Sequence, residues 1–139
     1  MSPRRIKTRD VPRERYSTYL KKARGFLRAA EASLAVGDWD AAALNAVHCG
    51  ISSADALLVF KAGVRSGSDS HSDAAALLDR HFAGDEAGPK AGTLSKILSY
   101  KNLAAYEDRE VSDAEAREAA KLARRFFDAA EAKLKAMGG

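Results

Sequence analysis

The 139-residue sequence contains one cysteine, three prolines and one tryptophan, and these small numbers limit what the chain can be. The single cysteine, Cys49, cannot form an internal disulfide, and its place in an apolar helical pattern indicates a small buried side chain. Alternating runs of β-branched residues, which would indicate strands, are missing. Alanine is abundant instead, so the sequence predicts an all-α domain of a size that encloses one core.

Patterns for metal binding and membrane insertion are missing as well. His48, His71 and His81 lie far apart, without the paired Cys and His spacing of a zinc site, so we expect no metal or cofactor. We find no apolar run that approaches the roughly 20 residues needed to cross a bilayer. The residues after Met1 are basic rather than apolar, unlike a signal peptide. We therefore expect a cytoplasmic protein that does not bind a membrane.

Positive charge is concentrated near the N-terminus, although the net charge of the whole chain is only +4. Residues 1–28 carry ten Lys and Arg side chains against two acidic ones, a local charge of +8, whereas the rest carries 13 basic and 17 acidic side chains. Clustered cations attract polyanions such as RNA. A solubilising tail and an arm that binds an acidic protein have the same composition, so these alternatives stay open. The expected phosphate contacts are Arg4, Arg5, Lys7, Arg9, Arg13 and Arg15.

Helix start and stop signals predict five helices joined by loops rich in Gly, Pro and Ser. The expected N-caps of four of them are Asp10, Asp38, Thr93 and Ser112. The expected spans are about 12–36, 39–62, 75–82, 94–106 and 113–137. Short loops between such helices predict an antiparallel four- to five-helix bundle. The chain then divides into a flexible basic arm, residues 1–11, and one helical domain, residues 12–137.

Two residues within the predicted helices are unexpected. Gly50 lies inside the second helix, at a cost of about 1 kcal/mol relative to Ala, which suggests a close crossing of two helices. Lys101 projects from the middle of an apolar face of the fourth helix, so it must extend past its neighbours, find a partner, or face a second subunit or a ligand. That apolar face consists of Leu94, Ile97, Leu98, Ala104 and Ala105. A second, polar stripe of the same helix consists of Ser95, Ser99, Asn102 and Tyr106.

Several short motifs together resemble a HEPN domain over roughly residues 19–134. They are Phe26-Leu27-Arg28-Ala29-Ala30, Gly37-Asp38-Trp39-Asp40-Ala41-Ala42, Ala54-Asp55-Ala56-Leu57-Leu58, Lys101-Asn102-Leu103-Ala104-Ala105-Tyr106 and Phe126-Phe127-Asp128-Ala129-Ala130. HEPN domains are four- or five-helix bundles that often dimerise. The resemblance implies one of three roles: a ribonuclease, a toxin paired with a small nucleotidyltransferase, or a noncatalytic module that binds RNA or nucleotides.

The sequence departs from the catalytic motif of that family. The motif consists of an arginine, commonly followed by a polar residue, and a histidine four to six residues later, and two copies meet across a dimer to cleave RNA without metal. Here Lys101 stands at the arginine position, Asn102 matches the polar residue, and Tyr106 stands at the histidine position. Lysine lacks the planar fork that pairs two phosphate oxygens. A phenol is also a poorer acid or base than imidazole at neutral pH.

We therefore expect a noncatalytic module that binds RNA or nucleotides and forms a homodimer. Lys101, Asn102 and Tyr106 would line a pocket near the dimer interface. The resemblance further implies a role in a toxin–antitoxin or phage-defence system, with a nucleotidyltransferase-type partner. Two alternatives remain. One is a metal-independent endoribonuclease with a rearranged site, in which His71 or His48 supplies the base, and the other is a protein-interaction bundle that binds an acidic partner.

Overall fold

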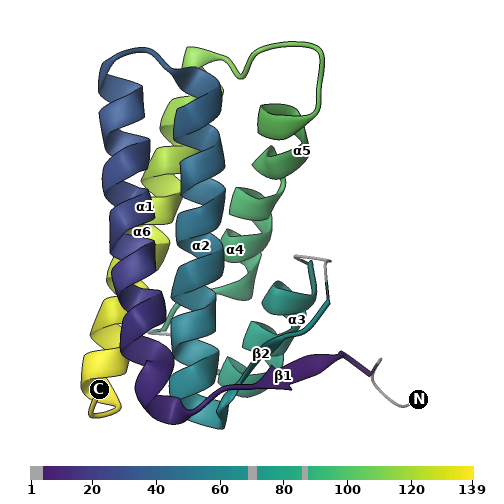
Figure 1. Ribbon diagram of the computed structural model, residues 1–139, viewed down its shortest axis with the longest axis vertical. Coiled ribbons are helices and arrows are strands. Elements are labelled where there is room, and N and C mark those ends of the chain that lie inside the picture. The colour runs from purple at the N-terminus through teal and green to yellow at the C-terminus, as the bar shows by residue number, and fades with distance from the viewer. Residues whose placement is uncertain (1–4, 69–71, 86–87) are drawn as a thin grey trace.

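The computed structural model describes residues 5–68, 72–85 and 88–139 and shows a helical bundle with a small two-stranded ribbon at one end (Figure 1). The long helices are α1 (Tyr16–Ala35), α2 (Trp39–Ala62) and α6 (Asp113–Ala136). The shorter ones are α3 (Ser72–Phe82), α4 (Ala91–Leu98) and α5 (Tyr100–Ala105), and a 3-10 helix, η1 (Arg13–Arg15), precedes α1. Strands β1 (Thr8–Asp10) and β2 (Val64–Ser66) form the antiparallel ribbon. The predicted all-α bundle is confirmed, with the ribbon as an addition.

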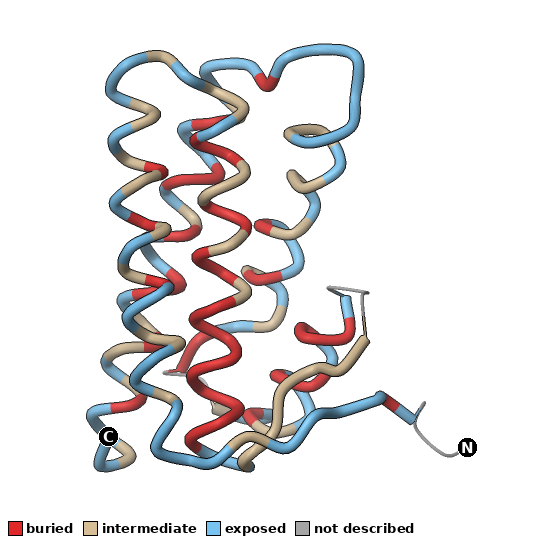
Figure 2. Tube along the Cα trace, in the orientation of Figure 1, coloured by how far each residue is buried: buried red, intermediate tan, exposed pale blue. Residues whose placement is uncertain are grey.

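Helix α2 is the central element of the bundle. Helices α1, α3, α4, α5 and α6 all pack against it, and Figure 2 shows that it is buried along most of its length. A helix covered on nearly every side needs apolar residues on nearly every side, and α2 has them. Its length and composition alone would let it cross a membrane, but 78% of its most apolar stretch is buried inside the fold, as in the core helix of a bundle.

The helix ends follow the predicted signals at four places. Gly37 follows α1 with a φ of 79°, and Gly63 ends α2 with a φ of 66°, a left-handed conformation that glycine adopts without steric cost. Asp38 occupies the N-cap position of α2, as predicted, but its side chain makes no capping hydrogen bond. Helix α6 starts with the predicted capping box, in which Ser112 and Glu115 each accept a hydrogen bond from the other's backbone N–H.

The chain before α1 differs from the prediction. The signals at Asp10 and Pro12 predict a helix start, but residues 8–10 pair with residues 64–66 and the α-helix begins only at Tyr16. The predicted start is wrong because strand pairing satisfies the backbone groups of residues 8–10, and this pairing depends on a distant segment.

The second half of the predicted flexible arm also packs against the domain. Ile6 is buried with Leu58 and Leu77, and the Val11 N–H donates a hydrogen bond of 2.8 Å to the Gly63 carbonyl oxygen. Arg4 and the residues before it lie outside the described residues. The described part of residues 1–11 is thus attached to the fold by the ribbon.

One further start signal is wrong. Thr93 is predicted to cap the fourth helix, but α4 begins at Ala91, its N-cap position is Lys90, and no side chain caps it. The third predicted helix is confirmed as α3, and His71 lies outside the described residues.

The predicted close crossing at Gly50 is confirmed. A Cβ atom at this position would lie 3.2 Å from both Leu94 Cδ1 and Ile97 Cγ2 of α4, closer than almost all real Cβ contacts. The absence of a side chain at Gly50 therefore lets α4 approach the central helix.

We expect Gly50→Val to lower the free energy of unfolding by about 1–3 kcal/mol, because the added methyl groups would overlap with α4. Gly25 provides the matched control, because no atom lies within 4 Å of where its Cβ would be. Gly25→Val should be close to neutral, and Gly25→Ala should stabilise the fold by about 1 kcal/mol. Urea denaturation measures all three effects. Equal stability of the two valine variants would contradict the close packing of α4 on Gly50.

Candidate functional site

The segment that carries Lys101 consists of two helices rather than the single helix predicted for residues 94–106. Helices α4 and α5 meet at Ser99, whose Oγ donates a hydrogen bond of 2.6 Å to the Lys96 carbonyl oxygen. Serine hydroxyls compete in this way with the backbone N–H groups that would continue a helix. The single-helix prediction is therefore wrong at Ser99.

This break changes which residues face the core. The inward-facing residues are Leu94 and Ile97 in α4, and Tyr100, Leu103 and Ala104 in α5. Lys101 follows Tyr100, so it lies beside the inward face of α5, half-buried, and Ala105 is exposed. The predicted position of Lys101 in the middle of an apolar face is wrong, because Tyr100, Leu103 and Ala104 pack against the core instead.

The polar stripe is exposed on both helices. Ser95, Ser99, Asn102 and Tyr106 all lie on the surface. The Tyr106 side chain is 74% exposed, and its backbone N–H donates a hydrogen bond of 2.9 Å to the Asn102 carbonyl oxygen at the end of α5. Two of the three predicted site residues therefore present their side chains to solvent.

The structure places His48 of α2 near Lys101. The pKa of His48 is lowered from its usual value near 6.5, chiefly by burial and further by the positive charge of Lys101. Phe26 of α1 covers the same imidazole, with 5.2 Å between ring centroids and an interplanar angle of 32°. Three helices thus contribute to one surface, which we call the His48 surface: Phe26, His48 and Lys101.

Sequence reasoning missed most of this surface. The sequence suggests His48 only as a substitute base, and it suggests no functional role for Phe26 beyond its place in a family motif. The available signal is the stripe of α2 that stays partly open, at the helical spacing of Leu44, His48 and Ile51. That stripe shows where α2 can meet a ligand, but it does not show which residues of α1 and α5 lie next to it.

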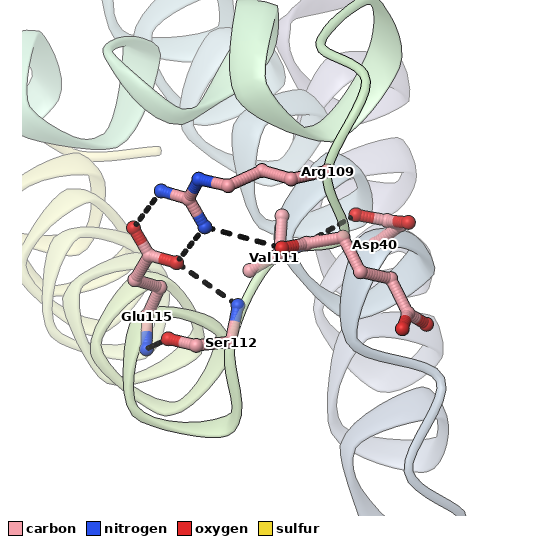
Figure 3. A network of polar contacts seen from close by, with 6 residues as sticks. Asp40, Arg109, Val111, Ser112 and Glu115 are labelled. Atoms are coloured by element: carbon pink, nitrogen blue, oxygen red, sulfur yellow. Dashed lines mark hydrogen bonds and ion pairs between the residues drawn. The ribbon is translucent and has the colours of Figure 1, made fainter.

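A polar network fixes the loop between α5 and α6 (Figure 3). The Asp40 carboxylate at the start of α2 accepts a hydrogen bond of 2.8 Å from the Val111 N–H. Arg109 donates two hydrogen bonds of 2.9 Å to the two carboxylate oxygens of Glu115. Arg109, together with the hydrogen bonds from Ser112, lowers the pKa of Glu115 to about 2. The network joins the loop to the starts of α2 and α6 and so holds the end of α5 in place.

The basic N-terminal residues lie on a different part of the molecule. Arg5, Lys7, Arg9, Arg13 and Arg15 are exposed at the ribbon end. His48 and Gly63, which adjoins the ribbon, are 15 residues apart, so about 22 Å of helix separates them at 1.5 Å per residue. The structure therefore does not bring the basic segment and Lys101 into one site.

The described residues form neither an activated thiol nor a metal site. Burial raises the pKa of Cys49 to about 12, so its thiol is not an activated nucleophile. Within residues 5–68, 72–85 and 88–139, no three His, Cys, Asp or Glu side chains gather as a metal site.

A family model of the HEPN domain matches residues 16–133. None of the curated proteins compared with the chain matches it. The matched range begins where α1 begins and contains the whole His48 surface, whereas β1 and η1 precede it.

We expect an NMR titration to give a pKa for His48 below the usual value, and Lys101→Gln to raise that pKa because a nearby positive charge is removed. His81 is an internal control, because burial and the charges of Lys61 and Arg80 lower its pKa instead. A protonated His48 is disfavoured in the folded state, so its contribution to stability is lost as the pH falls through about 6.5. An unchanged His48 pKa in the Lys101 variant would contradict their proximity.

Proposed function

The chain belongs to the HEPN domain family, and we propose that it is a noncatalytic member that binds RNA or nucleotides through the His48 surface. Membership of this family makes the chain a nucleotide- or RNA-related module in general. The observation that carries the finer proposal is the pair of rings, Phe26 and His48, with the amine of Lys101 beside them. Nucleobases stack on aromatic side chains, and an ammonium group binds the adjoining phosphate.

The chemistry of α5 supports binding rather than cleavage. Lys101 offers a point charge to a phosphate, without the two parallel hydrogen bonds of an arginine. Tyr106 is an exposed phenol at the end of α5, where the catalytic motif of the family would place an imidazole. Asn102 is exposed on the preceding turn and offers an amide to a base or a ribose.

A second candidate function is a metal-independent ribonuclease in which His48 is the base. The observation that favours it is the lowered pKa of His48 beside Lys101, which keeps the imidazole neutral at pH 7 and able to accept a proton. The same neutral imidazole is equally suited to stacking, and a complete cleavage site also needs a second acid or base. Binding is therefore the preferred proposal.

We further propose that two copies associate through the open stripe of α2. Leu44 and Ile51 are half-buried on this stripe, and Leu98 of α4 is half-buried as well. A second copy would cover the Leu44 end of the stripe, one turn from His48, and so bring two His48 surfaces to the edge of the interface, where a ligand still reaches them. The proposed setting is a cytoplasmic toxin–antitoxin or phage-defence system with a nucleotidyltransferase-type partner, and an adjacent gene for such an enzyme would support it.

We expect the purified protein to bind a single-stranded oligoribonucleotide without cutting it. Lys101→Gln should weaken binding and flatten the slope of log affinity against log salt by about 0.7, the value for one phosphate contact. Phe26→Leu should weaken binding by about fivefold or more through lost stacking, with the salt slope unchanged. Lys121→Gln, an exposed change of equal charge on α6, is the control. Equal affinity of all four proteins would contradict the proposal.

Cleavage assays separate the two candidate functions. The double variant Lys101→Arg with Tyr106→His restores both groups of the family motif, and a gain of metal-independent cleavage is expected. Cleavage by the unmodified protein that disappears in His48→Ala would instead establish the ribonuclease and contradict the noncatalytic proposal.

Sedimentation should give a mass of about twice the 14.9 kDa of the chain. Leu44→Glu should shift the protein to the monomer, because a carboxylate cannot be buried without a partner at the interface. Ala32→Glu, on the exposed side of α1, is the matched control and should leave the dimer intact. A monomer at high micromolar concentration in the unmodified protein would refute the proposed association.

A further inference from the structure

A hollow of about 290 Å³ lies at the ribbon end, where β1, η1 and the first turns of α1 meet. Its lining consists of Asp10, Val11 and Pro12 together with Arg15 of η1 and Thr18, Tyr19 and Lys22 of α1. The spacing from Arg15 through Thr18 and Tyr19 to Lys22 places these four side chains on one side of the helix. We call this feature the ribbon hollow.

The ribbon adds two arginines next to this hollow. Arg9 and Arg65 are direct partners across β1 and β2, so their side chains leave the ribbon on the same face. The Arg65 guanidinium lies 5.4 Å from the centre of the Tyr19 ring, and the Lys22 amine lies 5.9 Å from it. Tyr19 is therefore surrounded by positively charged side chains from both the helix and the ribbon.

Nearby carboxylates compensate this charge only in part: the lining holds one carboxylate, Asp10, against the two cations Arg15 and Lys22. Asp55 of α2 lies 3.4 Å from Arg65, but it is almost fully buried, and burial raises its pKa to about 6 despite the attraction of Arg65 and Lys22. Within the part of the chain that the structure describes, Arg9, Arg15 and Lys22 form no ion pair. Like charges that face each other across two strands destabilise the pairing. An anion bound in the ribbon hollow would remove this repulsion.

We propose that the ribbon hollow binds a phosphoryl group of a nucleic acid strand. Arg15 and Lys22 hold the phosphate oxygens, Arg9 adds a third positive charge, and the Thr18 hydroxyl is a further donor. The volume lies just below the range of about 300–1,000 Å³ for small-molecule sites, so the hollow suits a small group such as one phosphoryl unit of a strand. The proposal rests on the proposed function for the class of ligand, but it uses a separate surface. Its ribbon part precedes the residues matched by the family.

RNA binding at several salt concentrations tests the ribbon hollow. The double variant Arg15→Gln with Lys22→Gln should lose about tenfold in affinity for a 12-nucleotide single strand at low salt, and its salt slope should flatten by about 1.4. The control, Lys121→Gln with Arg125→Gln, removes the same charge from the exposed side of α6 and should keep the wild-type affinity. Equal affinities of the two double variants would overturn the proposal.

Two forms of the strand identify the source of the phosphate. If the Arg15/Lys22 variant loses affinity only for a strand with a 5′-phosphate, the hollow binds a terminal phosphate. If this variant loses affinity equally for strands with a 5′-phosphate and a 5′-hydroxyl, the hollow binds a phosphate of the strand's backbone. Both results support a phosphoryl site.

Inorganic phosphate tests the hollow without RNA. At constant ionic strength, replacing chloride by phosphate should shift the amide NMR signals of Thr18, Tyr19 and Lys22 in the unmodified protein and not in the Arg15/Lys22 variant. Absence of these shifts overturns the ribbon hollow, whatever Lys101→Gln does to RNA affinity. If these shifts occur but Lys101→Gln leaves the RNA affinity unchanged, the ribbon hollow stands. The proposed role of the His48 surface is then contradicted.

Discussion

The burial of α2 on nearly all sides is the constraint on which the rest of the structure depends. Each large apolar side chain that this helix buries stabilises the fold by about 1.5–3 kcal/mol, so the other elements are arranged to cover it. Helices α1 and α6 cover two sides, and Gly50 lets α4 approach a third. Because the cover is so complete, the stripe through Leu44, His48 and Ile51 is the region through which α2 can meet a ligand or a second copy.

Helix-end signals that act within one turn of the chain can be predicted from the sequence. Gly37 and Gly63 end helices because their own backbone takes a left-handed conformation, and Ser112 and Glu115 satisfy each other's N–H groups. The two-stranded ribbon could not be predicted, because the pairing of Arg9 with Arg65 joins segments far apart in the sequence. The break at Ser99 is an exception among local signals, because its hydrogen bond to Lys96 lies within one turn but competes with a helical pattern that continues on both sides.

The residues of the candidate site also differ in whether local sequence or tertiary packing identifies them. Lys101, Asn102 and Tyr106 could be selected because their spacing within one segment matches a family motif. Phe26 and His48 could not, because their contact is made between helices. The inward position of Tyr100, Leu103 and Ala104 also changes the reason for the half-burial of Lys101. A lysine beside the inward face can rest its methylene groups on the bundle and keep its amine near His48, so its place in the fold does not require a second subunit.

The position of the two proposed surfaces on α1 determines which ligand can contact both. Lys22 of the ribbon hollow and Phe26 of the His48 surface are four residues apart on this helix, about 6 Å along its axis, so neighbouring nucleotides of one strand can contact both surfaces. A strand that spans both converts its second contact into an intramolecular event, and the affinity then exceeds that of either contact alone. Because the ribbon fixes β1 against the domain, this distance is set by the fold rather than by a flexible arm. The arrangement therefore favours a short strand, which contacts both surfaces, over a single nucleotide.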